Sequence, residues 1–416
     1  MPRKFTRREM IAGTATALGA AAVAKVGTAS AQEGAAASGP IVTVPADPTK
    51  LQGLPTSPLG ARSPFVRPSR SPVGETVGSS LTPLQELTGP ITPSDLHFER
   101  HHAGIPVIDP AKHRLMIHGL VDRPITLSLD DLKRFPQVTR TYFIECSGNG
   151  RNAFRAPKPD MTAQKVAGMM STSEWTGVPL ATLFREVGAK SDASWFLAEG
   201  GDACLMTRSV PMAKAWDDAL IVWAQNGEPL RPAQGYPLRL LLPGWEGNIN
   251  VKWLRRLELG TQPWRTRWET SKYTDPLPGN KSREFSFEND VKSIITSPSH
   301  PRTLEARGWY SVQGLAWSGR GRVTKVEVSP DGGRTWEFAE LMGPALPKAA
   351  VRFQYMLHWT GGEQVLLSRA TDDAGFTQPP RAELLAARGL GTDYHFNQIV
   401  GWKVARDGAI TFHGES

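Results

Sequence analysis

The chain has 416 residues, with 48 Lys and Arg against 40 Asp and Glu, and a formal net charge of +8. Residues 1–31 hold five basic side chains and one acidic side chain, so half of this net charge belongs to that segment. The modest basic excess of the remainder argues against a nucleic-acid-binding protein. Its length is enough for two domains.

The N-terminus has the order of an export signal. A basic head with the pair Arg7 and Arg8 is followed by an apolar, Ala-rich run to about Val26, and then by the small residues 29–31. This order predicts a twin-arginine signal peptide over residues 1–31 and a periplasmic protein. The apolar run is too short for a stable membrane span, so we expect none after cleavage. An N-terminal anchor helix is the alternative.

The next segments differ in texture. Residues 32–90 are rich in Pro, Ser, Gly and Ala and predict an extended, wrapping or partly disordered arm. Residues 91–285 mix short strands and helices without a regular βαβ repeat, which is typical of an α+β domain. The elements expected there are a strand at 115–120, a helix with Ser128 as N-cap and Asp131 in the capping-box position, an amphipathic helix at 180–187 and a buried strand at 237–242.

Residues 290–416 predict an all-β domain. The alternation at 323–328, the turn residues Asp331-Gly332-Gly333 and the return at 335–338 indicate a hairpin. A second pair of strands is expected at 352–358 and 364–370. Short strands at this spacing predict a β-sandwich.

Cys146 carries the main functional signal. It ends an apolar, β-prone stretch, precedes a Ser-Gly-Asn-Gly loop, and stands five residues before Arg151. A thiol beside a cation is expected to ionise easily, and a thiolate is a soft ligand for a redox metal. Cys204 is the one other cysteine, and a disulfide between the two is an alternative. The chain has no Cys-x-x-Cys-His motif, so we expect no covalently bound c-type haem.

Four segments together resemble the sulfite oxidase family of molybdenum enzymes. They are Asp95–His102, Glu145–Arg151, Gly235–Pro237 through Val251–Trp253, and Gly314–Gly319 through Asp331–Trp336. The resemblance implies a molybdopterin-binding α+β domain over 91–285, an immunoglobulin-like dimerisation domain over 290–416, and a molybdenum–molybdopterin cofactor. The stretches Gly244–Trp253 and Asn397–Trp402 look most like the molybdenum subunit of bacterial sulfane dehydrogenases.

The resemblance also assigns roles to residues. Cys146 matches the protein ligand of molybdenum. Arg100 and Arg151 match positions that face the substrate, where a guanidinium fork binds sulfur oxyanions. His102 matches a histidine near the pterin and Lys252 a lysine on the cofactor phosphate. Asn149 is expected to brace the cysteine loop. A satisfied histidine, a turn asparagine and surface salt bridges are the respective alternatives for His102, Asn149 and the arginines.

Several positions depart from the family pattern. By spacing, Trp223 stands where the family places a tyrosine at the metal, and we assign it a catalytic position. Gln234 and Ile249 stand for a histidine and an arginine of the pterin-binding segment, and the stretch at 397–398 lacks a further arginine. Fewer cations should suit a small dianion poorly. This favours sulfane sulfur carried on another protein's cysteine over free sulfite.

We therefore predict a molybdenum sulfane dehydrogenase subunit. Its expected partners are a c-type cytochrome that accepts electrons, a sulfur-carrier protein as substrate, and a second copy of the chain bound through the C-terminal domain within a heterotetramer. A periplasmic sulfite dehydrogenase on the same scaffold is the main alternative. A reductase, for example of sulfoxides, and an exported β-sandwich binding module without activity are two others.

Overall fold

The computed structural model describes residue 47 and residues 55–277 and 279–415. The predicted signal peptide therefore lies outside the described residues. The chain divides into an N-terminal unit that ends at Arg67 and a second unit over Pro68–Ser416. Residues 55–67 of the first unit are turns and extended chain. No helix among the described residues is long and apolar enough to cross a bilayer.

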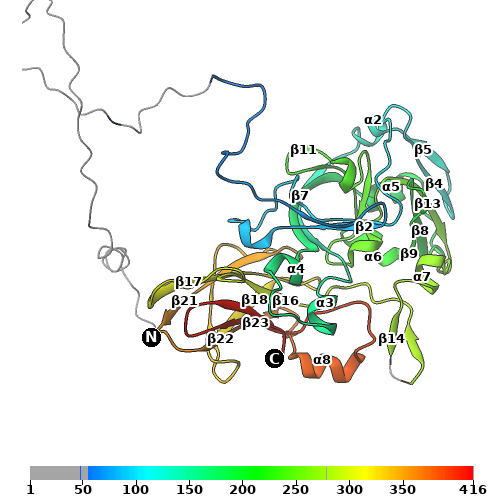
Figure 1. Cartoon of the computed structure of the whole chain (residues 1–416). Coiled ribbons are helices and arrows are strands. Elements are labelled where there is room, and N and C mark those ends of the chain that lie inside the picture. Colours follow the sequence, from blue (N-terminus) through cyan, green and yellow to red (C-terminus); the bar gives the residue numbers. More distant parts are fainter. Residues whose placement is uncertain (1–46, 48–54, 278, 416) are drawn as a thin grey trace, which may run out of the picture. The chain divides into compact units, whose positions relative to one another are not determined.

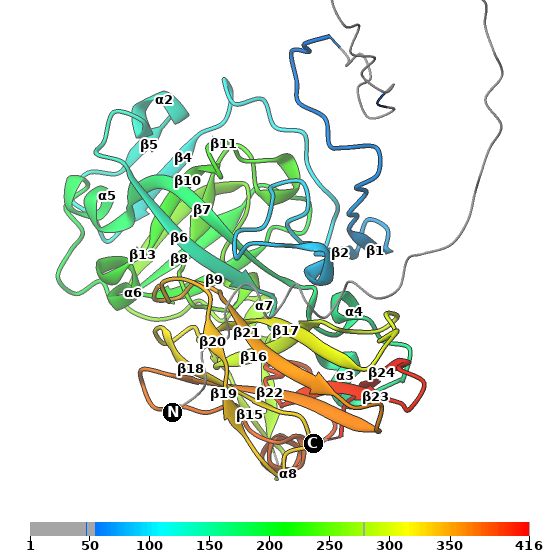
Figure 2. The ribbon, with the colours of Figure 1, turned by 90° about the vertical axis from the view of Figure 1, so that its left-hand side faces the viewer.

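The second unit begins with an α+β domain built on three sheets (Figures 1 and 2). Two short strands and a 3-10 helix fall within the range predicted as an arm. The first sheet contains β1 (Ser71–Gly74), β2 (Gly78–Leu81) and β3 (Glu99–His101), and η1 (Leu84–Glu86) follows β2. The second has the order β11-β10-β7-β6, with β12 paired to β10. Its strands are β6 (Val138–Glu145), β7 (Met170–Pro179), β10 (Leu220–Gln225), β11 (Glu228–Pro229) and β12 (Arg239–Leu241).

The third sheet has the order β5-β4-β13-β8-β9, and β4 and β13 are parallel. The second and third sheets pack against each other through a shared apolar core. Several short helices cover these sheets because their apolar faces enter that same core. The strands are β4 (Leu115–Gly119), β5 (Ile125–Leu127), β8 (Trp195–Gly200), β9 (Thr207–Pro211) and β13 (Leu254–Gly260). The helices are α2 (Leu129–Leu132), α3 (Arg151–Arg155), α4 (Ala163–Ala167), α5 (Leu180–Glu186), α6 (Met212–Asp217), α7 (Arg267–Thr270), η2 (Pro232–Gln234) and η3 (Gly247–Ile249).

Local signals predicted several of these elements. At α2, Asp131 N–H donates to Ser128 Oγ at 3.2 Å and Ser128 N–H donates back to Asp131 Oδ2 at 3.0 Å, so the predicted capping box is confirmed. The amphipathic helix predicted at 180–187 is α5. The buried strand predicted at 237–242 is the three-residue β12.

Two short antiparallel strands, at 275–277 and 281–283, precede the C-terminal domain, and this domain is a sandwich of two sheets. One sheet has the order β16-β17-β21-β20 and the other β19-β18-β22-β23-β24. The elements are β14 (Asp275–Leu277), β15 (Lys281–Arg283), β16 (Lys292–Ser297), β17 (Gly308–Trp317), β18 (Val323–Ser329), β19 (Glu337–Phe338), β20 (Glu340–Leu341), β21 (Val351–Trp359), β22 (Gln364–Asp372), α8 (Arg381–Arg388), β23 (Val400–Val404) and β24 (Ile410–His413).

The predicted hairpin at 331–333 is present, with both glycines at positive φ (75° and 93°). Its return strand is shorter than expected. Asp331 accepts the N–H and the hydroxyl of Thr335, at 2.9 and 2.7 Å, which keeps Thr335 in the turn. The strands at 351–359 and 364–372 do not pair with each other, because β21 joins one sheet and β22 the other.

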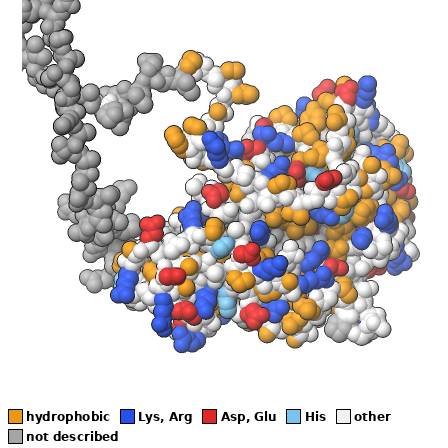
Figure 3. Space-filling view, viewed as in Figure 1, with side chains coloured by type: hydrophobic (Ala, Val, Ile, Leu, Met, Phe, Trp, Pro, Cys, Tyr) orange, Lys and Arg blue, Asp and Glu red, His pale blue; other side chains and the backbone are white. Residues whose placement is uncertain are grey.

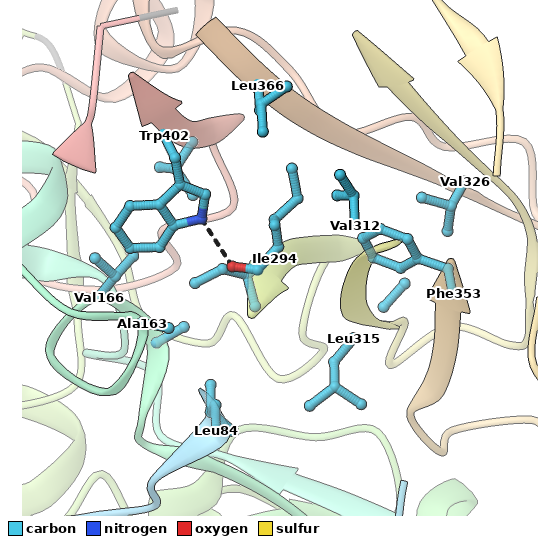
Figure 4. Packing of buried hydrophobic residues seen from close by; sticks show 14 of the residues in the cluster. Leu84, Ala163, Val166, Ile294, Val312, Leu315, Val326, Phe353, Leu366 and Trp402 are labelled. Atoms are coloured by element: carbon cyan, nitrogen blue, oxygen red, sulfur yellow. Dashed lines mark hydrogen bonds between the residues drawn. The ribbon is translucent and has the colours of Figure 1, made fainter. Parts of the chain in front are cut away.

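The two domains share an apolar core (Figure 4). Leu84, Ala163 and Val166 from η1 and α4 lie in one cluster with Ile294 and Leu315 from the sandwich. In the same cluster, the indole N–H of the buried Trp402 donates to the carbonyl of Ile295 at 2.9 Å. Because this interface is apolar and closely packed, the sandwich holds a fixed position against the α+β domain.

Candidate active site

Cys146 directly follows the last residue of β6, as predicted, and is 9% exposed. Its N–H donates to the carbonyl of Met169 at 3.0 Å, and its carbonyl accepts the N–H of Asn149 at 2.9 Å. These bonds fix the backbone where the strand turns into the loop. The thiols of Cys146 and Cys204 are both free, so the alternative disulfide does not form.

The ionisation of Cys146 differs from the expectation. Burial raises the pKa of its thiol, and this effect exceeds the lowering by the Gly148 backbone hydrogen bond and by the charges of Arg100 and Arg151. The prediction that a nearby cation makes this thiol ionise easily is therefore wrong for the protein alone. A bound metal cation favours the thiolate strongly and acts in the opposite direction.

One pocket opens beside Cys146, and it brings together most of the predicted site. Arg100, His102 and Lys252 line it with Cys146. Its other walls include residues of β3, the η2–β12 segment and η3, and the side chain of Tyr273. The lining that matters for chemistry also contains His101, Asp202, Gln234, Arg239, Gly247 and Asn248.

Lys252 is held by several internal acceptors. Its Nζ lies 3.1 Å from Arg100 O, 3.0 Å from Ala233 O and 2.9 Å from His101 Nδ1. It also lies 4.4 Å from the centroid of the Trp253 ring. Burial, together with the neighbouring Arg239, lowers the pKa of Lys252 well below its usual value. An anionic group in the pocket would favour its charged form.

His102 contacts a tyrosine that the sequence reading did not identify. Its Nε2 lies 2.6 Å from Tyr273 Oη. Burial, and then the charge of Arg100, lowers the pKa of His102 to about 4. The imidazole is therefore neutral near pH 7 and holds the phenol of Tyr273 in place. The Arg208 guanidinium lies 5.3 Å from the centroid of the Tyr273 ring.

Arg151 is the first residue of α3 and is not among the residues that line this pocket. Its Nε and Nη2 donate to the carbonyl of Asp393 at 3.0 and 2.8 Å, and the side chain is 39% exposed. Its guanidinium carbon is 5.6 Å from the ring centroid of Tyr394. Asp393 and Tyr394 belong to the C-terminal domain, so that domain holds the Arg151 side chain.

Asn149 braces the cysteine loop, as expected. Its Nδ2 donates to Glu145 Oε1 at 2.8 Å and to Ala167 O at 3.1 Å, and its Oδ1 accepts the N–H of Met169 at 3.1 Å. The side chain is 2% exposed and lines a small cavity beside Cys146 rather than the main pocket. Its contacts are therefore with the protein and not with the pocket that would receive a cofactor.

The placement of Trp223 at the metal is wrong. Leu220 and Val222 of β10 pack in the apolar cluster that contains Cys146, whereas Trp223 packs in the core between this sheet and the sheet of β4, β13 and β8. Side chains alternate between the two faces of a strand, so Trp223 faces away from the pocket. The tyrosine that lines the pocket with Cys146 is Tyr273, which lies in a loop 50 residues after Trp223.

The pocket also contains a cation that the sequence analysis did not count, Arg239. It lines the pocket beside Gln234 and is 4% exposed. An isolated bridge pairs its backbone with Lys252. Ile249, read as the substitute for an arginine, is instead fully buried in the apolar core. Arg239 was missed because it stands inside the apolar run 237–242.

The C-terminal stretch at 397–398 lies next to the cysteine loop, at the small cavity and not at the main pocket. Asn397 lines the small cavity beside Cys146 together with Lys292 and His395, and its Nδ2 donates to Val291 O at 3.3 Å. Gln398 is buried, and its carbonyl accepts from a neighbouring glutamine. A lysine therefore lies beside Asn397, with its charge paired to the Glu145 carboxylate 2.9 Å away.

The donor set fits an anionic cofactor that carries a soft metal. Cys146 supplies one thiol, and the pocket walls supply buried cations. The buried Nε of Arg239 has no hydrogen-bond partner among the described residues, so it is open to an acceptor. Within that same part of the chain, no group of three or more His, Cys, Asp or Glu side chains is arranged to hold a metal.

Comparisons with known proteins identify the two domains. Residues 102–268 match the oxidoreductase molybdopterin binding domain, and residues 283–401 match the Mo-co oxidoreductase dimerisation domain. The structure is similar to the crystal structure of the sulfane dehydrogenase SoxCD from Paracoccus pantotrophus. The TM-score is 0.84 at 40% identity, covering 88% of this chain and 97% of that chain.

Curated relatives are more distant. The mitochondrial sulfite oxidase of Rattus norvegicus is 32% identical over 70% of this chain, and the NADH nitrate reductase of Ulva prolifera is 32% identical over 70%. The chain covers 57% and 38% of the lengths of these two relatives. By both of its domains and by its similarity to a solved structure over nearly the whole of that structure's chain, this protein belongs to the sulfite oxidase family of molybdopterin oxidoreductases.

Proposed function

We propose that the protein is the molybdenum subunit of a sulfane dehydrogenase. It would oxidise sulfane sulfur, as a persulfide or S-thiosulfonate, held on the cysteine of a carrier protein. The observation that carries this proposal is the similarity to a sulfane dehydrogenase at 40% identity over 88% of the chain. The pocket supports it with a buried thiol among cations.

Each side chain of the pocket has a role in this proposal. Cys146 would hold the metal, and Lys252 and Arg239 would hold the anionic part of the cofactor. A bound molybdenum cofactor supplies the two-electron redox step and the oxygen transfer. Arg100 lines the pocket, and Arg151 follows Cys146 by five residues outside that lining; both guanidinium groups would bind sulfur oxyanions and favour negative charge on oxygen.

Tyr273 adds a neutral donor to this set. Its hydroxyl is 2.6 Å from the neutral imidazole of His102, and its ring lies against Arg208. When His102 Nε2 carries its proton and donates to this hydroxyl, the phenol proton is free for a hydrogen bond to substrate oxygen without rearrangement during the reaction. Because Tyr273 lines the pocket with Cys146, it takes the place of Trp223 as the aromatic side chain proposed at the metal.

The partners and the location belong to the same proposal. Electrons would leave to a c-type cytochrome subunit, because the sequence has no motif for covalent haem. The match to a dimerisation domain supports a homodimer through the sandwich, within a heterotetramer. The twin-arginine pattern of residues 1–31 supports export to the periplasm in a folded state. Basic and acidic side chains alternate over the face in Figure 3, which offers no continuous basic surface to a nucleic acid.

A sulfite dehydrogenase is the second candidate, and two observations favour it. Arg239 keeps the pocket cationic, contrary to the reading from sequence, and a cationic pocket suits a small dianion. A mitochondrial sulfite oxidase is among the curated relatives.

The test is to isolate the native protein with its partners and to measure molybdenum, haem and turnover. Reduction of cytochrome c is followed with free sulfite and with sulfane sulfur loaded on a carrier-protein cysteine. The proposal expects one molybdenum for each chain, haem on a separate subunit, and turnover that depends on the loaded carrier. Faster turnover of free sulfite without a carrier would establish the second candidate. Protein without molybdenum, from a host that makes the cofactor, would refute both.

A further inference from the structure

The residue before Cys146 is a buried carboxylate held by the C-terminal domain. Glu145 is 5% exposed. Lys292 Nζ, at the start of β16, lies 2.9 Å from its Oε1. The indole N–H of Trp317, at the end of β17, donates to its Oε2 at 2.7 Å. Both oxygens of a carboxylate in the α+β domain are therefore bound by the sandwich.

Lys292 holds the cysteine loop at a second point. Its Nζ donates to the carbonyl of Asn149 at 3.1 Å, and Asn149 Nδ2 itself donates to Glu145 Oε1 at 2.8 Å. One ammonium group thus bonds to the loop on both sides of Cys146. The ion pair is almost closed to solvent, with side-chain exposures of 7% and 6%.

A third contact from the same domain falls between these two. The N–H of His395 donates to the carbonyl of Ser147 at 2.7 Å. The C-terminal domain therefore bonds to residues 145, 147 and 149. The thiol between them is left to face the pocket.

Stability alone does not account for this arrangement. A buried ion pair contributes little net stability, since desolvation of both charges offsets their attraction, and apolar replacement of a whole pair is often neutral. The apolar interface in Figure 4 already joins the two domains. Groups that surround a metal ligand do, in contrast, set its orientation and electronic character.

We propose that Lys292 and Trp317 are positioning residues that orient Cys146 through Glu145. The dimerisation domain is thereby a working part of the metal site. This inference rests on the proposed function in one respect, that Cys146 binds molybdenum. It adds that the sulfur reaches its bonding direction only while the sandwich holds the residues on either side.

The test uses the cofactor-loaded protein with the double substitution Glu145→Gln and Lys292→Met. Removing Lys292 alone would leave a buried carboxylate without its cation and could unfold the protein, whereas the double variant keeps both shapes and buries no charge. The matched control is Lys348→Met. Lys348 pairs with Asp218 at 2.6 Å, and this ion pair also joins the two domains but makes no contact with the cysteine loop.

The main readout is the electron paramagnetic resonance spectrum of the partly reduced metal. This spectrum depends on the orientation of the thiolate sulfur relative to the metal. Molybdenum content, melting temperature and kcat are measured beside it. We expect the double variant to keep its molybdenum and its fold, to change the spectrum, and to lose at least ten-fold in kcat. The Lys348→Met control should keep the wild-type spectrum and rate.

An unchanged spectrum and rate in the double variant would overturn the proposal. So would the same changes in the Lys348→Met control, because they would reflect general loosening of the interface. Failure of the proposed function is distinguishable, since wild-type protein would then lack molybdenum or show no cysteine sulfur by X-ray absorption.

Discussion

The substitution Gly247→Ala is a sharp probe of the site, because it presses directly on the backbone of Cys146. Gly247 opens η3 and has no positive φ, so alanine can adopt its backbone conformation. A Cβ added there would lie 2.9 Å from the carbonyl oxygen of Glu145 and 3.3 Å from both Cα and N of Cys146. All of these are backbone atoms, so no side chain can turn aside to make room.

The size of the effect follows from these distances. Carbon atoms approach oxygen to about 3.3–3.6 Å and other carbons to about 3.5–4.0 Å in ordinary packing. Relief of the contact therefore needs η3 and the end of β6 to move apart by roughly 0.5 Å, and this displaces Cys146 relative to the pocket wall that η3 forms. Overpacking of this kind costs about 1–3 kcal/mol. A misplacement of about 1 Å can cost 10²-fold in rate, so half of that distance predicts about a ten-fold loss of kcat.

The assay measures kcat with an artificial electron acceptor, molybdenum for each chain, and the melting temperature. Gly362→Ala is the matched control, because a Cβ there meets no heavy atom within 4 Å. The Gly247→Ala variant should be slower at equal molybdenum content, with a melting temperature a few degrees lower. A wild-type kcat in this variant, or an equal loss in Gly362→Ala, would refute the reasoning.

Three further predictions concern the ligand, the buried charges and the dimer. Cys146→Ser should remove turnover while the chain stays folded, because serine has nearly the same volume but lacks the soft thiolate sulfur; measurable turnover would refute the ligand assignment. Arg208→Met should lower the free energy of unfolding by about 3–5 kcal/mol, because Arg208 is fully buried between the carboxylates of Glu246 and Glu269, at 3.2 and 3.7 Å. A loss below about 1 kcal/mol in urea unfolding would contradict this. Trp309→Glu should raise the dimer dissociation constant at least 30-fold, because Trp309 is 55% exposed where β17 pairs with β21, with its ring 4.8 Å from that of His358 between centroids. Sedimentation velocity checks this, and an unchanged dimer would place the interface elsewhere.

Features that depend on neighbouring residues could be predicted from sequence. The capping box at Ser128 depends on residues three apart, and Cys146 ends a strand because its own apolar run ends there. The turn at 331–333 follows from glycines that accept a positive φ. In each case the physical cause lies within a few residues, so a local pattern contains it.

Features that depend on distant contacts could not be predicted. The assignment of Trp223 rested on spacing along the chain, but the face that a strand presents is set by the sheets packed against it. A bulge in the pairing of β10 with β7, between Val222 and Ala224, adds to this. Tyr273 lies in a loop, has a φ of 54° and lines the pocket. The residues next to it in the sequence give no indication that it lies there.

Arg239 shows a different kind of failure. The run Pro-Leu-Arg-Leu-Leu-Leu predicts a buried strand, and the strand is buried. The single charged residue in this apolar run was given no function. Burial lowers the pKa of Arg239 to about 9, a cost that is tolerated where an anion is expected. A charged residue within a strand that is predicted to be buried therefore indicates a binding site, even where the rest of the strand is apolar.

The charge distribution of the site bears on substrate choice. An anionic cofactor held by Arg239 and Lys252 would neutralise them, so they would add little attraction for a second anion. Arg100 and Arg151 are the cations assigned to the substrate, but the Arg151 guanidinium already donates twice to the carbonyl of Asp393, and the Asp393 carboxylate lies 3.6 Å from its Nε. A free dianion must compete with that carboxylate, whereas a sulfur atom delivered on a carrier gains its affinity from contacts between the two proteins. The cations that line the pocket are thus compatible with a carrier-bound substrate, and the pairing of Arg151 with Asp393 favours it over free sulfite.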